Sequence, residues 1–162
     1  MTDDAPTDDA PAPALPAGTI HATCIAIGTQ GVLIRGPSGS GKSALALALM
    51  LDAPRALPPA ELVADDRVLL AMEDGALVAR PPVALAGLVE ARGLGIRRVP
   101  YRPFVAVRWL VDLAAADAVR MPQAGSLRAE MYGIELKRIA AQEPGQARLL
   151  LAAAFATDDH QN

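Results

Sequence analysis

Short apolar runs, separated by glycine, proline and charged residues, organise the chain from residue 18 onward. Runs of this length that contain β-branched residues predict strands where turn residues bound them. Two of the runs flank Glu73-Asp74-Gly75, which is a strong signal for a hairpin. The predicted strands are 23–27, 32–35, 62–64, 68–72, 76–80 and 105–113.

Segments rich in alanine and leucine predict two helices, one over 42–51 after a glycine-rich loop and a closing one over 146–156. A helical turn is expected around 85–90, ahead of an arginine-rich segment. Strands and helices that share an aliphatic core indicate an α/β domain with a mixed sheet and flanking helices. Because hairpins interrupt the alternation of strand and helix, the pattern departs from simple βαβ units.

One compact domain is expected over residues 18–156. Residues 1–17 hold four aspartates and four prolines but no basic residue. They have little apolar surface to bury, so they are predicted to form a disordered acidic tail. Residues 157–162 are predicted to fray for similar reasons.

The composition narrows the class of protein. Hydrophobic residues make up 52% of the 162 residues and aromatic residues only 3%, so the core is aliphatic. No apolar stretch reaches the roughly 18 residues that span a bilayer, and the N-terminus lacks the pattern of a signal peptide. Cys24 is alone, which fits a reducing compartment, and a net charge of −3 argues against a general nucleic-acid binder. We therefore expect a cytoplasmic protein that binds neither nucleic acid nor membrane.

The strongest motif is Gly36-Pro37-Ser38-Gly39-Ser40-Gly41-Lys42-Ser43, a full match to the P-loop pattern. Its glycines let the backbone turn so that successive N–H groups face phosphate oxygens, and the following helix points its N-terminus at the same anion. Lys42 places its charge on the β- and γ-phosphates, and the Ser43 hydroxyl completes a Mg²⁺ shell. The motif therefore predicts binding of a nucleoside triphosphate.

A second candidate is the acid pair Asp65 and Asp66. Phosphoryl transfer to a hydroxyl benefits from a base beside the nucleophile. The pair stands at the end of the apolar strand 62–64, where a site on an open α/β sheet is expected. Because side chains alternate along a strand, one acid can face the nucleotide while the other braces the structure. The alternative is a charged turn that only ends the strand.

Glu90 opens a segment that is rich in arginine and has no further acid before residue 112. A locally positive patch of this kind suits phosphate or an acidic partner surface, although a solvated loop has the same composition. His21, two residues before the strand at 23–27, is a weaker candidate that incidental placement also explains. Arg120 carries no signal of its own. The arginines of the patch are Arg92, Arg97, Arg98, Arg102 and Arg108.

Four separated pieces resemble the HPr kinase/phosphorylase family in their order and spacing. His21 stands fifteen residues before Gly36, as the family's histidine does. The two motifs after the P-loop are specific, because few other P-loop proteins combine them. The resemblance covers residues 18–122, and more weakly the rest. The pieces are His21, the P-loop, Leu62-Val63-Ala64-Asp65-Asp66-Arg67-Val68 and Glu90-Ala91-Arg92-Gly93-Leu94-Gly95-Ile96.

The resemblance implies a kinase that uses ATP and Mg²⁺ to phosphorylate a serine of HPr, the phosphocarrier protein of the sugar phosphotransferase system. It makes Asp66 the base that takes the serine proton. It also implies phosphorolysis, in which inorganic phosphate attacks phosphoserine and releases pyrophosphate. A fold related to phosphoenolpyruvate carboxykinase and a hexameric assembly follow from the same resemblance. The remaining residues that it assigns are His21, Lys42 and Arg120 for catalysis and Ser43 and Glu90 for Mg²⁺.

The chain also departs from the family. No counterpart of the family's N-terminal domain is found, so a short form is expected. Pro59-Ala60-Glu61 replaces the usual Gly-His, and the C-terminal segment tied to dephosphorylation has no clear counterpart. These departures count against phosphorolysis and against the hexamer, whereas the kinase motifs are present. Two alternatives stay open: a P-loop kinase for a small metabolite, and a non-catalytic nucleotide sensor that docks a partner through the arginine-rich segment.

Overall fold

The computed structural model describes residues 15–159. The first strand begins at Leu15, before the expected start of the domain at residue 18. Most of the predicted acidic tail (1–17) and the last residues of the predicted frayed end (157–162) lie outside the described residues, so both stay predictions. Within the described range, no helix combines the length and the hydropathy needed to cross a membrane.

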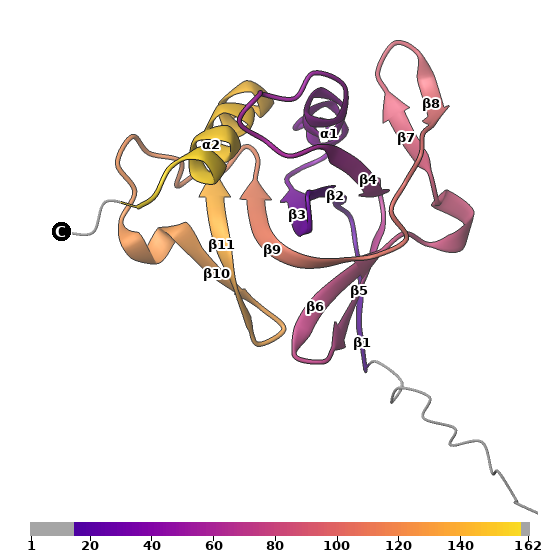
Figure 1. Cartoon of the computed structure of the whole chain (residues 1–162), viewed down its shortest axis with the longest axis horizontal. Coiled ribbons are helices and arrows are strands. Elements are labelled where there is room, and N and C mark those ends of the chain that lie inside the picture. Colours follow the sequence, from indigo (N-terminus) through magenta and orange to yellow (C-terminus); the bar gives the residue numbers. More distant parts are fainter. Residues whose placement is uncertain (1–14, 160–162) are drawn as a thin grey trace, which may run out of the picture.

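Strands dominate the described part of the chain, and two α-helices accompany them (Figure 1). Short 3₁₀ turns occur at Val83–Leu85 and Ala124–Leu127. The helices are α1 (Lys42–Leu51) and α2 (Pro144–Ala156). The strands are β1 (Leu15–Ile20), β2 (Thr23–Ile27), β3 (Gln30–Arg35), β4 (Ala60–Ala64), β5 (Val68–Glu73), β6 (Ala76–Arg80), β7 (Leu88–Ala91), β8 (Gly95–Arg98), β9 (Val105–Asp112), β10 (Arg128–Met131) and β11 (Ile134–Ala140).

Strand β9 joins the two halves of one mixed sheet. Its first residues, Val105 and Ala106, pair antiparallel with β6, and from Trp109 onward it pairs parallel with β11. Its other edge pairs parallel with β3. The sheet therefore branches and curls at β9, in the order β1-β5-β6-β9-β3-β2-β4, with β11 and β10 added at the second half of β9 (Figure 1). Strands β7 and β8 form a separate hairpin.

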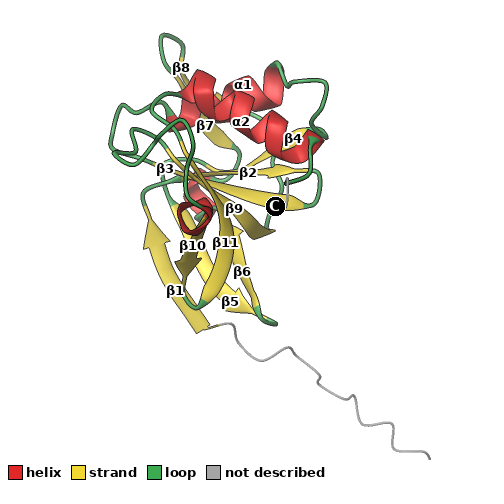
Figure 2. Cartoon of the chain, turned by 90° about the vertical axis from the view of Figure 1, so that its left-hand side faces the viewer, coloured by secondary structure: helices red, strands yellow, loops and turns green. Residues whose placement is uncertain are grey.

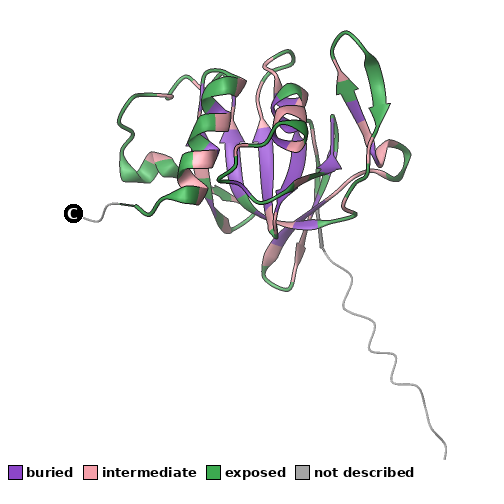
Figure 3. Ribbon diagram, turned by 45° about the horizontal axis from the view of Figure 1, so that its top comes forward, coloured by how far each residue is buried: buried purple, intermediate pink, exposed green. Residues whose placement is uncertain are grey.

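Both helices cover the same face of the sheet and lie side by side (Figure 2). Side chains alternate along the strands, so Ile25 packs beneath the helices against Leu45 and Leu49, whereas Cys24 belongs to a second apolar cluster on the opposite face. Full burial of one such aliphatic side chain contributes about 2 kcal/mol. The strands beneath the helices are accordingly buried, and β7–β8 is largely exposed (Figure 3). This packing fixes α1 and the loop before it on a rigid base.

The predicted strands and helices are present, and the helix at 42–51 has the bounds expected from sequence. The helical turn expected around 85–90 is wrong, because a 3₁₀ turn ends at Leu85 and residues 88–91 form β7. The hairpin is favoured because Val89 becomes buried and Gly93 and Gly95 supply the positive φ of its turn. Apolar runs do not predict β10 and β11, because charged residues interrupt both strands.

Candidate active site

A cavity of about 660 Å³ opens at the N-terminus of α1, between the P-loop, the end of β4 and the β7–β8 hairpin. It collects side chains that are far apart in the sequence, because β2, β4 and β7 all end or begin at this edge. Gly36, Pro37 and Ser40 belong to the P-loop but do not line the cavity. The predicted residues that line it are His21, Ser38, Gly39, Gly41, Lys42, Ser43, Asp65, Asp66 and Glu90.

The P-loop presents unsatisfied donors to the cavity side of α1. Helix α1 has Gly41 as its N-cap and no side-chain cap, so its first N–H groups are available to a ligand. Lys42 Nζ donates to the carbonyl oxygens of Gly36 (2.9 Å) and Pro37 (3.1 Å), which holds the ammonium group over the loop. A phosphate group satisfies donors of this kind, so the loop fits the phosphates of a nucleotide.

Residues from the C-terminal half support the P-loop from behind. Gly41 has φ 96°, and a Cβ at this position would overlap Pro144 at the start of α2. Gly36 has φ 156°, and a Cβ there would overlap Ser40 Oγ and press against Leu113. Only glycine fits these two positions, so packing that is remote in sequence sets the shape of the loop.

Asp65 is the buried centre of the site, with 5% of its surface exposed. Its Oδ1 accepts hydrogen bonds from Thr23 Oγ1 (2.7 Å) and Ser43 Oγ (2.7 Å). Its Oδ2 lies 2.9 Å from Ser43 Oγ and accepts from the backbone N–H of Glu90 (3.1 Å). One carboxylate therefore ties together β2, α1 and β7 and orients the Ser43 hydroxyl. Thr23 is a site residue that sequence reasoning missed, and its only signal is a hydroxyl at the start of an otherwise apolar run.

Asp66 lies in a different environment from its neighbour. Its φ of 67° takes the chain out of β4 in a left-handed turn, a conformation that aspartate tolerates better than most residues. The carboxylate is two-thirds exposed on the cavity wall, and its Oδ1 lies 3.0 Å from His21 Nε2. Asp66 is thus accessible to a substrate and held by one specific partner. This geometry suits a general base.

The remaining predicted ligands stand on the β7–β8 side of the cavity. Glu90 is exposed there, and Arg92 Nη2 lies 4.0 Å from where a Cβ of Gly39 would be, so Arg92 faces the P-loop. In the described range, no group of three or more His, Cys, Asp or Glu side chains is placed to hold a metal by itself. Mg²⁺ usually takes one or two protein oxygens together with waters and phosphates. The Ser43 hydroxyl donates a hydrogen bond to Asp65, which leaves its oxygen lone pairs free for a metal. Ser43 and Glu90 therefore fit Mg²⁺ that arrives with a nucleotide.

Arg120 does not line the cavity. It is exposed in the segment 113–127, between β9 and β10. Its catalytic role therefore remains a prediction from the family resemblance.

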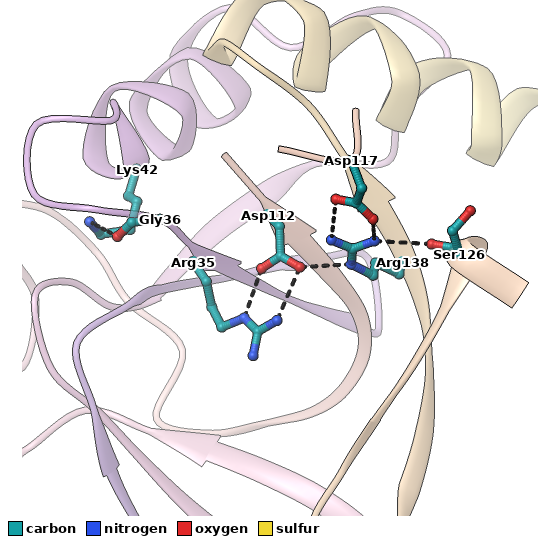
Figure 4. Close-up of polar contacts among 7 residues, drawn as sticks. All are labelled: Arg35, Gly36, Lys42, Asp112, Asp117, Ser126 and Arg138. Carbon is teal, nitrogen blue, oxygen red and sulfur yellow. Dashed lines mark hydrogen bonds and ion pairs between the residues drawn. The ribbon is translucent and has the colours of Figure 1, made fainter. Parts of the chain in front are cut away.

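A charged network beside the P-loop is the second feature that sequence reasoning missed. Asp112, at the end of β9, accepts two hydrogen bonds from Arg35 (2.8 and 3.0 Å) and one from Arg138 (2.7 Å). Arg138 also donates to both carboxylate oxygens of Asp117 and to the Ser126 carbonyl. Figure 4 shows the Asp112 carboxylate between the two guanidinium groups. The network links β3, which leads into the P-loop, to β11 and to the segment 113–127.

Opposing effects set the pKa values in this network. Partial burial disfavours the charged form of Asp112, but hydrogen bonds from Arg35 and Arg138 outweigh it and hold its pKa below the usual value. Hydrogen bonding to Arg138 likewise lowers the pKa of Asp117, and the two carboxylates raise the pKa of Arg138. All three groups are therefore charged at neutral pH.

Part of the sequence also matches a known protein family. Residues 15–101 match the family described as HPr Serine kinase C-terminal domain. The match includes His21, the P-loop, Asp65, Asp66 and Glu90, whereas Arg120 lies beyond it.

Individual proteins with HPr kinase names are also similar to the chain. The chain is 41% identical over 81 residues to HPr kinase/phosphorylase of Clostridium acetobutylicum and 43% identical over 79 residues to that of Streptococcus thermophilus. The aligned part covers about half of this chain but only 25% and 24% of those relatives. The solved structure of the Hpr(Ser) kinase/phosphatase from Coxiella burnetii superposes with a TM-score of 0.65 at 30% identity, covering 83% of this chain and 86% of that one.

Proposed function

The chain belongs to the HPr Serine kinase C-terminal domain family, and we propose that it transfers the γ-phosphoryl group of ATP to a serine of an HPr-type phosphocarrier protein. The observation that carries the proposal is the pair Asp66–His21 on the wall of the cavity that the P-loop also lines. A nucleotide on the loop and a hydroxyl beside Asp66 would share one space. The names of the relatives support a protein acceptor.

The chain's own groups divide the work of binding. Backbone N–H groups at the start of α1 hold phosphate oxygens, and Lys42 exchanges its two carbonyl partners for the β- and γ-phosphates. Asp65 keeps the Ser43 hydroxyl oriented. Mg²⁺ bound at Ser43 and Glu90 would supply positive charge against the phosphates.

Asp66 carries the proton transfer. It accepts the proton of the serine hydroxyl while the serine oxygen forms its bond to the γ-phosphorus. The bond from that phosphorus to the bridging oxygen of the β-phosphate breaks, and ADP leaves. His21 holds Asp66 Oδ1 in place during the step. In phosphorolysis, which the family resemblance implies, a protonated Asp66 would give its proton to the serine oxygen while inorganic phosphate takes the phosphoryl group and leaves as pyrophosphate.

Several finer expectations rest on the family resemblance alone. These are the relation of the fold to phosphoenolpyruvate carboxykinase, the hexameric assembly and the catalytic role of Arg120, whereas a cytoplasmic location is expected from the composition. We retain them as part of the proposal.

A transfer assay tests the proposal. The purified chain is incubated with Mg²⁺, γ-labelled ATP and the HPr-type carrier, and Lys42→Ala serves as the control. We expect label on a carrier serine with the wild-type chain and none with the variant. An unlabelled carrier, with nucleotide binding confirmed, contradicts the proposal. Label on a small metabolite would favour a metabolite kinase, and nucleotide-dependent partner binding without transfer would favour a sensor.

A further inference from the structure

The β7–β8 hairpin stands apart from the main sheet and carries an unusual surface. Its two strands pair only with each other among the described strands, and the hairpin projects from the body of the molecule (Figure 1). All four residues of β8 are exposed. Leu94 at its tip is 75% exposed and Ile96 is 63% exposed. Leu94 and Ile96 therefore place exposed aliphatic surface beside the arginines of the hairpin.

The arginines of this region fall into two groups. Arg102 is engaged, because it donates to Glu61 and to the carbonyl of Gly28. The side chains of Arg92, Arg97 and Arg98 form no ion pair or hydrogen bond with any partner in residues 15–159. The hairpin therefore combines exposed aliphatic side chains with guanidinium groups that have no counter-charge in the described chain.

The base of the hairpin is fixed to the active site. Val89 is 1% exposed, the backbone N–H of Glu90 donates to Asp65, and Val99 N–H donates to the Gly87 carbonyl (2.8 Å). Ala91, Arg92 and Ile96 line the cavity itself. A molecule held on the hairpin would consequently lie at the mouth of the cavity.

The nucleotide accounts for only part of this surface. Arg92 faces the P-loop and lines the cavity, so it is placed to meet phosphate. Arg97 and Arg98 do not line the cavity. They pair in register with Val89 and Leu88, and as consecutive strand residues they point to opposite faces of the hairpin. Neither side chain lines the cavity, so a small ligand bound there leaves both uncovered and available to a larger partner.

We propose that the β7–β8 hairpin is the docking arm for the phosphoacceptor protein, and that the acceptor surface it binds is acidic around an apolar centre. The inference rests on the proposed function and names the surface through which the acceptor reaches Asp66. Charge complementarity to Arg97 and Arg98 favours an acidic occupant, and Leu94 supplies the apolar contact. Contacts of this kind mainly raise the rate of encounter and respond to salt.

The double charge reversal Arg97→Glu with Arg98→Glu tests the arm in the transfer assay. The matched control is Arg55→Glu, which reverses an exposed arginine in the segment after α1, away from the hairpin. We expect the KM for the HPr-type carrier to rise about tenfold or more in the double variant. The kcat at saturating carrier and the affinity for ATP should stay at wild-type values. The KM of the wild type should also rise with NaCl, and that of the double variant much less.

The possible outcomes distinguish a failure of the docking arm from a failure of the proposed kinase function. Transfer with an unchanged KM in the double variant overturns the docking arm and leaves the proposed function standing. If the wild type transfers no phosphate, binding of the carrier without ATP is measured for the same three proteins. Salt-sensitive binding that only the double variant loses would support the arm, and equal or absent binding would overturn it. The outcome would also overturn the arm if the double variant changes the KM in the full chain but not in a chain without residues 1–14. The occupant of the hairpin would then be the chain's own acidic N-terminal segment.

Discussion

Asp65 and Asp66 are neighbours in the chain, but their environments suit different roles. Asp65 is buried and its carboxylate receives hydrogen bonds from three groups, so it is fully engaged in holding Thr23, Ser43 and Glu90 together. Asp66 is exposed, and within residues 15–159 the one ion pair of its carboxylate is with His21. A base has to be accessible to its substrate, whereas a brace has to be buried and satisfied. At the scale of single residues, burial and one left-handed φ separate the two roles.

The hydroxyl of Thr23 should stabilise the site through Asp65. Thr23→Val keeps the shape of the buried side chain and removes the donor to Asp65 Oδ1, so the buried carboxylate loses one partner. We expect the free energy of unfolding to fall by about 2 kcal/mol. Denaturant unfolding measures it. Thr19→Val, at an exposed position of β1, is the control and should change stability by less than about 0.5 kcal/mol. Equal effects from both substitutions would show that the Asp65 hydrogen bond contributes nothing.

Sequence predicts single site residues only where a motif fixes their role. The P-loop pattern states which atoms meet phosphate, so the roles of Lys42 and Ser43 are predictable from the motif alone. Alternation along a strand predicts that the two aspartates point apart, but it does not say which one is buried. Thr23 escapes prediction because its role depends on Asp65, which lies 42 positions away in the chain.

At the scale of elements, α1 depends on its contact with α2. Helix α1 starts at Gly41 without a side-chain cap, and Pro144 at the start of α2 packs directly on that glycine. The two helices thus meet behind the P-loop. The sequence predicts both helices from their composition, but it does not predict that the start of one supports the P-loop before the other.

A pair of glycine substitutions isolates this junction. Gly41 and Gly75 have similar positive φ values, 96° and 78°, but nothing lies within 4 Å of a Cβ at Gly75. Gly75→Ala should therefore cost only backbone strain, about 1 kcal/mol. Gly41→Ala adds overlap with Pro144, which raises the loss to about 3 kcal/mol. Thermal unfolding without nucleotide measures both. Equal losses would mean that α2 does not constrain the P-loop.

The β7–β8 hairpin shows why boundaries of short elements are hard to predict. Residues 85–90 have an apolar pattern that a helical turn also satisfies. The strand forms because Val89 becomes buried and the backbone N–H of Glu90 donates a hydrogen bond to Asp65. Both interactions depend on tertiary partners. Local sequence does not contain those partners.

At the scale of the whole molecule, a charged network joins the P-loop strand to the C-terminal part of the chain. Asp112 bridges Arg35 and Arg138, and Arg138 holds the segment 113–127 through Asp117 and Ser126 (Figure 4). Removing the central carboxylate would leave two arginines facing each other. The curled sheet is therefore held by aliphatic burial on both faces and by this polar link between its strands.

Stability should depend on the charge of Asp112. Its pKa is lowered in the folded protein, so its contribution is complete above the unfolded value of about 3.9 and is lost as the pH falls through the lower folded value. Asp112→Asn should reduce the free energy of unfolding by about 3 kcal/mol at pH 7, and the difference from wild type should shrink below about pH 4. Denaturant titrations from pH 7 down to about pH 2, well below the usual aspartate pKa of about 3.9, measure this. Asp158→Asn, at an exposed position, is the control. A difference that does not change with pH would contradict the assignment.

The overall architecture is predictable only in part. Apolar runs and the P-loop indicate an α/β domain with a mixed sheet, because they are local signals. The branching at β9 is not predictable in this way, since it depends on β6, β3 and β11 meeting one strand from distant parts of the chain. Strand β11 carries Glu135, Lys137 and Arg138, which hides its strand character.

The role of Asp66 as general base is tested by the initial rate of phosphoryl transfer to the HPr-type carrier, compared between wild type, Asp66→Asn and Asp74→Asn. Asp74 is a matched control, because it is also an exposed aspartate at positive φ and lies outside the cavity. We expect Asp66→Asn to bind ATP as wild type does but to transfer phosphate about 10²–10⁴ times more slowly, while Asp74→Asn retains the wild-type rate. Wild-type turnover in Asp66→Asn would show that Asp66 is not the general base.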